Sequence, residues 1–523
     1  TLSSSSAASD VYKRQVLNRE GGALPRLSWL SGVALAMLPA AAFAAPPANL
    51  TDALVAAYYN NPTLQEQRAA LRQADEEVPT ALAGWKPTVE LQGQFGRVTG
   101  SEKYNTTSFD PRTQQYVTNS SKVPENGTEK IGQVTVTQPI YKGGKTVSQT
   151  RQAKNDVAAA RAQLLSQEQT IFQNVVQDYV AVVADQKLLA LQQSNQDVLT
   201  KQLHDTQTQF NLGEITMTSV AQAQASLAQA QEQVQVAQGN LRIARENFRQ
   251  LVGEYPADAL APPQPLVLPV SDKAEAGKVA VANNPDVVAA EFNDASQKDA
   301  VDVAFSALMP QLSLQASAYK QSGSSGQNTY TSGASFIGQL TVPLYQGGSE
   351  YAAIRQAKAK EQQAFAAVLV AQRKAYSQAT QSWEGMVSSR AAVLASNAQI
   401  KADAIALDGT EREELVGTRT TLDVLNAQQA VLTSQVQQVQ NIAQMVNYSY
   451  AIAAAIGRLT ARDLNLPVHA YDDQKYYDAV KYAGFGTGAA ADRRAGIAPD
   501  GELLNAPPVP PVVPVSDSAQ NAP

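Results

Sequence analysis

The feature that most constrains the fold of this chain is a six-residue motif that occurs twice. PIYKGG at 139–144 returns as PLYQGG at 343–348, 204 residues later. Each copy ends a strand-like run of alternating residues and opens a long run without proline. Proline closes a strand and a glycine pair lets the backbone turn before a helix starts. We therefore expect strand–helix junctions at Pro139, Gly143, Gly144, Pro343, Gly347 and Gly348.

Other landmarks keep the same spacing in both halves of the chain. Gly144 to Gly213 is 69 residues, as is Gly348 to Gly417, and a further glycine follows 40 residues later in each half. Only the stretch before the motif differs, with 52 residues between prolines in the first half and 33 in the second. This pattern predicts an internal duplication with a longer loop in one copy. Gly213 and Gly417 are expected to form the turns at the tips of two helical hairpins.

The two ends of the chain differ from the repeats. Residues 1–15 are interpreted as a non-native extension, and arginines followed by an apolar run and a small-residue cleavage site predict a signal peptide over 16–44. A transmembrane anchor is the less favoured alternative, because serine, glycine and proline interrupt the apolar run. No later run reaches the ~20 apolar residues of a spanning helix, so any membrane crossing should use strands. The Gly-, Ala- and Pro-rich residues 484–523 are expected to be a disordered tail.

Four segments alternate between apolar and polar residues, as transmembrane barrel strands do. They form two predicted strand pairs, 88–97 with 132–141 and 311–320 with 335–345. Residues 98–130 are rich in Ser, Thr, Asn and Gly and are predicted to be a solvated loop. Two amphipathic hairpins on a soluble core remain an alternative. If the strands do span a membrane, four are too few to close a barrel, so several chains must share one.

The remaining segments predict long helices. Residues 145–210 contain neither proline nor glycine, and the second half offers a matching helix over 349–414. Heptad patterns follow at 219–252 and 422–456, where large apolar residues alternate with alanine in the first copy. Such patterns favour close helix–helix packing, although an isolated coiled coil would show them too.

The expected domain organisation follows from these helices and strand pairs. Each repeat contains a short helical region, a strand pair, a long helix and a heptad helix. Repeat 1 spans 45–253 and repeat 2 spans 272–457, with an equatorial linker at 254–271 and an equatorial segment at 458–483.

Composition argues against several function classes. The chain has no cysteine, two histidines and a formal net charge of −6, so nothing indicates a thiol site, a zinc triad or a nucleic-acid partner. No nucleophile motif or phosphate-binding loop is present, and we expect a protein that is not an enzyme and needs no metal or cofactor.

At this point the chain resembles the TolC family of outer-membrane channel-tunnels, also called outer-membrane factors. The resemblance covers about residues 50–465 and rests on VGTRTTLDVL at 416–425 and the two strand–helix junctions. It implies a homotrimer with a 12-stranded barrel, four strands per chain, among the lipids of the outer membrane. A coiled-coil tunnel would continue through the periplasm. An adaptor (membrane fusion) protein would connect it to an inner-membrane RND or ABC transporter, for export of drugs or proteins.

The resemblance also implies a gate near the tips, formed by Arg419, Asp423, Asn426, Thr218 and Ser219. The family's matching arginine helps to hold the entrance closed, and its matching aspartate joins a ring that narrows the pore. This chain has Asn426 in place of a second ring aspartate, Ser219 in place of an aspartate and Glu414 in place of a tyrosine. We therefore expect weaker cation preference than two acidic rings would give.

Simpler interpretations remain open at the sequence level. Arg419 and Asp423 could be an exposed tip charge and an ordinary helix-start charge. The acidic residues Glu411, Glu413 and Glu414 could be a solvated helix face or an adaptor contact. For the whole chain, the alternative is a soluble periplasmic coiled-coil adaptor or scaffold.

Overall fold

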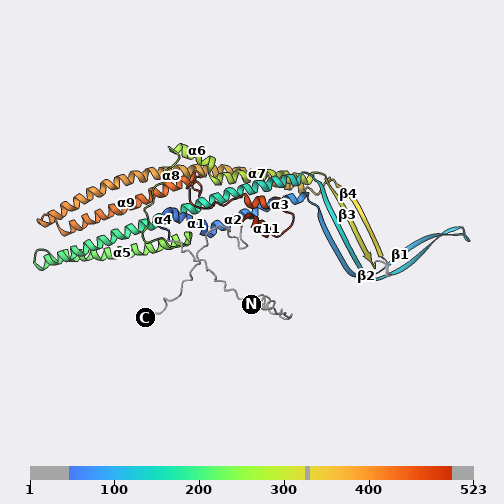
Figure 1. Ribbon diagram of the computed structural model, residues 1–523, viewed down its shortest axis with the longest axis horizontal. Helices are drawn as coiled ribbons and strands as arrows, with labels where there is room; N and C mark the ends of the chain where they lie inside the picture. Colours follow the sequence, from blue (N-terminus) through green and yellow to red (C-terminus); the bar gives the residue numbers. More distant parts are fainter. Residues whose placement is uncertain (1–45, 324–329, 497–523) are drawn as a thin grey trace, which may run out of the picture. The chain divides into compact units, whose positions relative to one another are not determined.

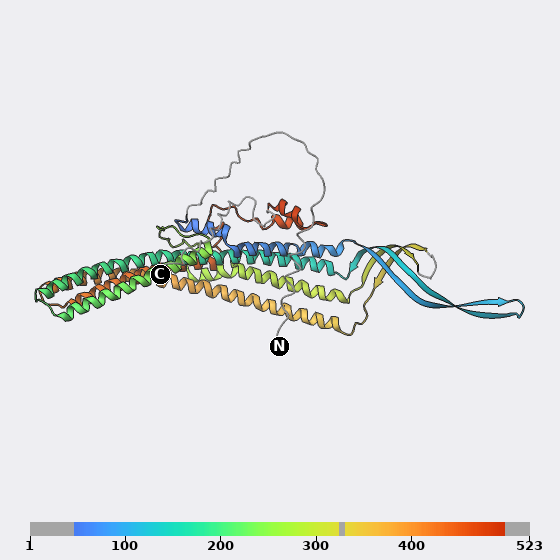
Figure 2. The ribbon, with the colours of Figure 1, turned by 90° about the horizontal axis from the view of Figure 1, so that it is seen from below.

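The computed structural model describes residues 46–323 and 330–496, which form long helices and one sheet (Figures 1 and 2). The predicted extension at 1–15, the predicted signal peptide at 16–44 and residues 497–523 of the predicted tail lie outside the described residues.

The first half contains five helices and a short 3₁₀ turn. They are α1 (Leu50–Asn60), α2 (Pro62–Asp75), α3 (Glu77–Leu82), η1 (Ala83–Trp85), α4 (Lys145–Asn211) and α5 (Met217–Val252). The second half contains α6 (Lys273–Asn283), α7 (Pro285–Phe305), η2 (Ser306–Leu308), α8 (Ser349–Leu415) and α9 (Thr421–Ala455). Helix α4 packs against α5 and α7, and α8 packs against α9 and α7 (Figure 1). Within the described ranges, no helix combines the length and the apolar character needed to cross a membrane.

The half-length helices are joined end to end in the same way in both halves. The side chain of Asn61 caps α2 and donates through Nδ2 to the carbonyl oxygen of Leu251, at 3.0 Å, in the last turn of α5. Asn284 caps α7 and donates to the carbonyl oxygen of Ala455, also at 3.0 Å, at the end of α9. Each asparagine therefore satisfies donors at one helix start and an acceptor at another helix end.

The sheet contains four strands in the order β1-β2-β3-β4, all antiparallel to their neighbours. Their bounds are β1 (Thr88–Asp110), β2 (Gln115–Lys142), β3 (Gln311–Ser322) and β4 (Tyr330–Thr341). The register aligns the apolar residues on one face, with Val89 opposite Val136 and Leu91 opposite Val134. Val89 and Leu91 are 67% and 81% exposed, so this face is apolar but uncovered within one chain.

The prediction of a loop over 98–130 is wrong. Strands β1 and β2 stay paired from Thr88 opposite Thr137 to Asp110 opposite Gln115. The segment lacks an apolar face, which is why its composition resembled a loop, but Thr and Tyr fit a pleated ribbon well. The longer segment of the first half is therefore a longer hairpin, which continues beyond β3 and β4 (Figure 2).

Two further boundaries differ from the predictions. Strand β4 ends at Thr341 rather than at residue 345, because Pro343 has no N–H to donate and two glycines with positive φ follow. The predicted disordered tail contains α11 (Ala489–Ala495). Its Ala491 and Ala495 pack against Tyr476 and Val480 of α10 (Lys475–Val480), an apolar contact that composition alone does not reveal.

The main core lies where the half-length helices meet. On α4, Phe172, Val175, Val176 and Tyr179 are fully buried, and α1, α2, α5, α9 and residues 459–466 pack around them. A second cluster joins α6, α8 and the end of α9. Burial is therefore concentrated at this level, and both equatorial segments contribute to it.

Candidate functional site

Two helical hairpins end in turns of the same geometry, on the side of the helices remote from the sheet (Figures 1 and 2). Gly213 follows α4 with φ of 80°, and Gly417 follows α8 with φ of 79°. The Gly213 N–H donates to Phe210 at 2.9 Å, and the Gly417 N–H donates to Glu414 at 2.8 Å. A left-handed glycine satisfies the last carbonyls of each helix and reverses the chain. Both predicted tip glycines thus lie in tight helix-terminating turns.

Arg419 forms an ion pair within its own hairpin. Its Nε donates to Glu413 Oε2 at 2.9 Å, and both side chains are about half exposed. Among the described residues, Arg419 has no hydrogen bond or ion pair with Thr218 or Ser219 of the other hairpin. Sequence reasoning grouped Glu413 with an acidic cluster and missed this partner. The only signal was a six-residue separation across the Gly417 turn.

Asp423 caps the start of α9 together with Thr420. Its Oδ2 accepts from the Thr420 N–H at 3.0 Å and from Thr420 Oγ1 at 2.8 Å, while the Asp423 N–H donates back to Thr420 Oγ1 at 3.3 Å. These hydrogen bonds, with a smaller contribution from the charge of Arg419, lower the pKa of Asp423. A fixed negative charge therefore lies at this tip across the physiological pH range.

The other predicted gate residues divide between the two hairpins. Asn426 is exposed and lies three residues after Asp423, on the same face of α9. Thr218 is exposed and Ser219 half-buried in the first turn of α5. Ser219 lies 204 residues before Asp423, at the matching position of its helix, but the side chain of Thr216 makes no capping hydrogen bond there. The second hairpin is therefore the better-capped and more strongly charged of the two.

A small apolar cluster ties the two hairpins together near the tips. Leu199 on α4, Ala230 on α5 and Leu425 on α9 pack together, with Leu227 beside them. Leu425 is 6% exposed, and its neighbour Asn426 projects from an exposed position of the same turn. The cluster holds Asp423 and Asn426 at a defined place relative to α5.

The tips also expose large apolar side chains. Leu212 and Met217 lie at the first turn, 71% and 57% exposed, and Leu415 and Val416 at the second, 82% and 74% exposed. Four such side chains at the ends of two adjacent hairpins form a surface that favours contact with another protein.

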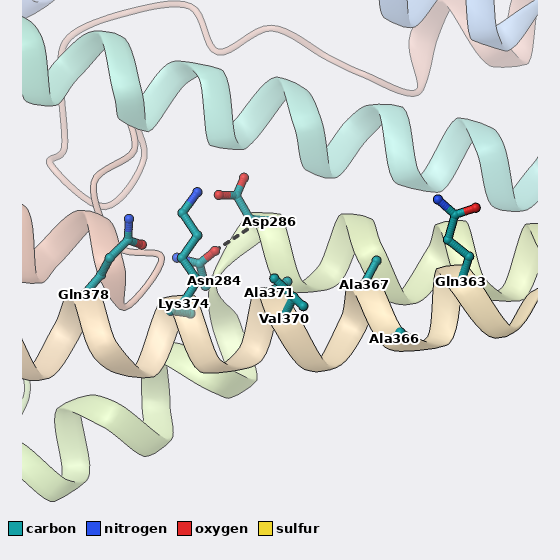
Figure 3. A pocket seen from close by; sticks show the side chains of 10 residues that line it. Asn284, Asp286, Gln363, Ala366, Ala367, Val370, Ala371, Lys374 and Gln378 are labelled. Atoms are coloured by element: carbon teal, nitrogen blue, oxygen red, sulfur yellow. Dashed lines mark hydrogen bonds between the residues drawn. The ribbon is translucent and has the colours of Figure 1, made fainter.

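A crevice between α7 and α8 lies away from the tips, close to the junction of α9 and α7 (Figure 3). Its volume is about 520 Å³, and it is lined by alanines of α8 together with Lys374, Asp286, Gln363 and Gln378. The Asp286 N–H donates to Asn284 Oδ1 at 2.9 Å, which is the cap of α7. Within the described residues, no group of three or more His, Cys, Asp or Glu is arranged to hold a metal.

Known proteins match this chain over most of its length. The family described as "Outer membrane efflux protein" matches residues 53–254 and 277–458. Outer membrane efflux protein BepC of Brucella suis biovar 1 is 32% identical over 438 residues, covering 84% of this chain and 91% of BepC. Alkaline protease secretion protein AprF of Pseudomonas aeruginosa is 26% identical over 462 residues, covering 84% of this chain and 90% of AprF. The crystal structure of the outer membrane protein VceC of Vibrio cholerae has a similar fold, with a TM-score of 0.65, 18% identity, and coverage of 78% of this chain and 96% of VceC.

Proposed function

Because the chain belongs to the outer membrane efflux protein family, the TolC family that the sequence resembles, we propose that three copies form the exit duct of a tripartite export system. The protein is an outer-membrane efflux or secretion channel whose helices lie in the periplasm. A soluble periplasmic scaffold, the alternative left open by the sequence, does not agree with this family membership. The observation that carries the proposal is a four-stranded apolar-faced sheet joined directly to long paired helices.

The edges of the sheet support assembly of several chains. Strands β1 and β4 each have a neighbour on one side only, so each leaves a row of backbone groups unpaired. Unpaired backbone N–H and C=O groups are too costly in lipid, so a sheet that spans the membrane must close into a barrel. With four alternating strands per chain, β4 of one copy can pair antiparallel with β1 of the next. Two copies would supply eight strands and three would supply 12; the family resemblance selects three.

The free side of α8 supports the same assembly. Large apolar side chains on this helix are 42–74% exposed in a single chain and recur along much of its length. They are Tyr351, Phe365, Leu369, Val387, Leu394 and Ile405. A neighbouring copy of the chain would cover this stripe and extend the helical wall sideways.

We infer an internal duplication from the matching details of the two halves. The repeated spacings support it, and so do Asn61 and Asn284, which bond to residues 204 apart, Leu251 and Ala455. The two glycine turns at the tips have the same hydrogen bonds. A shared origin explains these matches, while the different hairpin lengths reflect later divergence.

The tips are proposed to form the gated entrance. Three copies would bring three Asp423 carboxylates around one axis, which attracts cations and disfavours anions. Asn426 supplies no second charged ring, so the preference should be moderate. Arg419 would hold the closed state by contacts to a neighbouring chain, in competition with its bond to Glu413.

The partners and cargo follow from the same proposal. The exposed apolar side chains at the tips would dock a periplasmic adaptor protein, which connects the duct to an inner-membrane RND or ABC transporter. The relatives include an efflux protein and a protease secretion protein, so small molecules and proteins are both candidate cargo. The proposal assigns no catalytic step and no cofactor to this chain.

The mass of the assembly tests this proposal. The protein should be recovered from the outer-membrane fraction and, after extraction in mild detergent, light scattering should give a mass of three chains. Recovery as a monomer in the soluble periplasmic fraction would contradict both the location and the assembly.

A further inference from the structure

Apart from Lys142 at the end of β2, which pairs with Gln311, the first three strands separate their charges by face. Residues that pair across neighbouring strands lie on the same side of a sheet, and sides alternate along each strand. Phe95 pairs with Lys130, Gly132 pairs with Lys320, and Arg97 lies two residues beyond Phe95. Arg97, Lys130 and Lys320 therefore share the face of Val89 and Leu91. We call these three residues the cationic collar.

The opposite face carries the acidic side chains. Glu90, Glu102, Asp110 and Glu129 all alternate to that side, and Gln321 of β3 donates to Glu129 Oε1 at 2.6 Å there. In the part of the β1–β2 hairpin that continues beyond β3 and β4, the charges are again separated by face. Lys103 pairs directly with Lys122, and both lie on the face of the collar. Like charges placed opposite each other are unfavourable unless an anion neutralises them.

No ion pair within the described part of the chain neutralises the collar. Arg97, Lys130 and Lys320 are exposed, and none of them forms an ion pair with a described carboxylate. The Lys130 ammonium lies 5.7 Å from the centre of the Phe95 ring, which is itself 76% exposed. The face thus passes from aliphatic residues, through an aromatic ring, to unneutralised cations.

The spacing of the collar suits closely packed anions. Residues two apart on a strand are about 7 Å apart, and neighbouring strands lie about 4.8 Å apart. The three charges occupy successive rows at the end of the shared sheet, where β3 and β4 stop and the hairpin continues (Figure 1). They therefore fall within about 20 Å of one another on the same exposed face.

We propose that the cationic collar binds the phosphorylated headgroups of outer-leaflet lipid. This inference rests on the proposed barrel, in which the apolar face meets hydrocarbon and the end of the sheet remote from the helices points outward. Headgroups lie directly beyond the hydrocarbon layer, where basic side chains are attracted to anionic lipid. An acidic protein partner would not require the collar to continue an apolar, lipid-facing band. Lys103 and Lys122 would meet anionic groups further from the membrane.

Binding of diphosphoryl lipid A tests the proposal. Purified wild-type assemblies in phosphatidylcholine nanodiscs should bind this lipid, as followed by native mass spectrometry. The variant Arg97→Gln/Lys130→Gln/Lys320→Gln should bind roughly a hundredfold more weakly, at about fivefold per cation. A matched control removes three exposed cations from the helices, Lys187→Gln/Lys201→Gln/Lys401→Gln, and should bind as the wild type does.

Further binding measurements identify the source of the phosphate, and further variants replace the triple variant if it does not fold. Dephosphorylated lipid A should bind weakly to the wild type, and inorganic phosphate at the same concentration should not compete. If the triple variant does not fold, each single substitution should weaken binding about fivefold, and Lys130→Arg/Lys320→Arg should retain it. Higher salt should weaken binding to the wild type.

Three contradicting outcomes have two different meanings. Normal channels in planar bilayers together with unchanged lipid A binding by the triple variant would overturn the role of the collar alone. Equal losses in the collar variant and the helix control would overturn it too, because the effect would then be one of net charge. Absence of channels from the wild type and both variants would overturn the proposed function, and the inference with it.

Discussion

At the scale of single residues, Asp75 is the most unusual titratable group. It ends α2, is 1% exposed, and neither of its carboxylate oxygens has a hydrogen-bond partner among the described residues. Arg161 of α4 faces it, together with Glu76 and with Asp473 before α10. Burial raises the pKa of Asp75 to about 7, and the two carboxylates act in the same direction, against the charge of Arg161.

The raised pKa of Asp75 predicts that the folded chain loses stability as the pH rises. Below the ordinary value of 3.8 the carboxyl is protonated in the folded and unfolded chain alike, and between 3.8 and about 7 only the folded chain keeps its proton. The free energy of unfolding should therefore fall as the pH rises from 3.8 to about 7, by at most about 4 kcal/mol in all, and change little above that. Thermal unfolding from pH 5 to pH 8 should show this loss in the wild type and much less in Asp75→Asn. Equal pH dependence in Asp75→Asn would contradict it, while Asp205→Asn serves as an exposed control.

Arg419 carries the second residue-scale prediction. Its pair with Glu413 is exposed and screened by solvent, so it cannot alone keep a duct closed. Arg419→Gln should raise basal conductance severalfold, because the proposed contact with a neighbouring chain is lost. Glu413→Gln frees the arginine and should not raise it. The control is Arg412→Gln, which removes only a pair with Asp408 one turn away; unchanged conductance in Arg419→Gln would show that other contacts close the entrance.

Some of these residue contacts could be predicted from the sequence and others could not. The turns at Gly213 and Gly417 and the helix-start position of Asp423 follow from short, local patterns, and the structure has them there. The bond between Arg419 and Glu413 crosses a turn, and its geometry depends on how Gly417 directs the chain. Asp75 gave no signal at all, because its burial depends on packing against α4, where Arg161 lies, and on Asp473, almost 400 positions later.

At the scale of elements, the two strand–helix junctions share a motif but not an environment. Gly143 has φ of 63°, and a Cβ placed there would lie 2.6 Å from the Ser306 carbonyl oxygen and 2.6 Å from Met309 Cβ. Gly347 has φ of 73°, with no atom within 4 Å of such a Cβ. The first junction is packed against the end of η2, while its repeat is open within one chain.

The matched substitutions should therefore differ. Gly347→Ala should cost about 1–2 kcal/mol, the strain of a left-handed alanine. Gly143→Ala adds a collision with backbone and should cost at least about 3 kcal/mol. Thermal unfolding of the two variants checks the order, and equal losses would mean that the first junction relaxes without cost.

Long helices were more predictable than the hairpin for a physical reason. A run of 66 residues without proline or glycine has few alternatives to a helix, and α4 extends over Lys145–Asn211. Helix α8 extends over Ser349–Leu415, which contains Gly385 and Gly409 but no proline. In the hairpin beyond Val98 both faces are exposed, so its sequence lacks the alternation of apolar and polar residues by which a strand is recognised. Its pairing is set by the register with its partner strand, which composition does not reveal.

At the scale of the whole molecule, the account depends on lateral contact through α8. Leu394 is 67% exposed in the middle of the apolar stripe. Leu394→Asp should lower the fraction of assembled protein in detergent, because three charges would be buried at three equivalent interfaces. Val416→Asp changes a comparable apolar residue, 74% exposed, at the tip and should leave assembly intact. Light scattering distinguishes them, and a normal trimer in Leu394→Asp would remove α8 from the interface.

Single-channel recording of the purified protein in a planar bilayer, under a salt gradient, tests the central claim most directly. A duct with its entrance mostly closed should give a small, stable conductance, and the Asp423 ring should give a moderate preference for cations. Well-folded protein that inserts but never conducts, or that conducts with a preference for anions, would contradict the account.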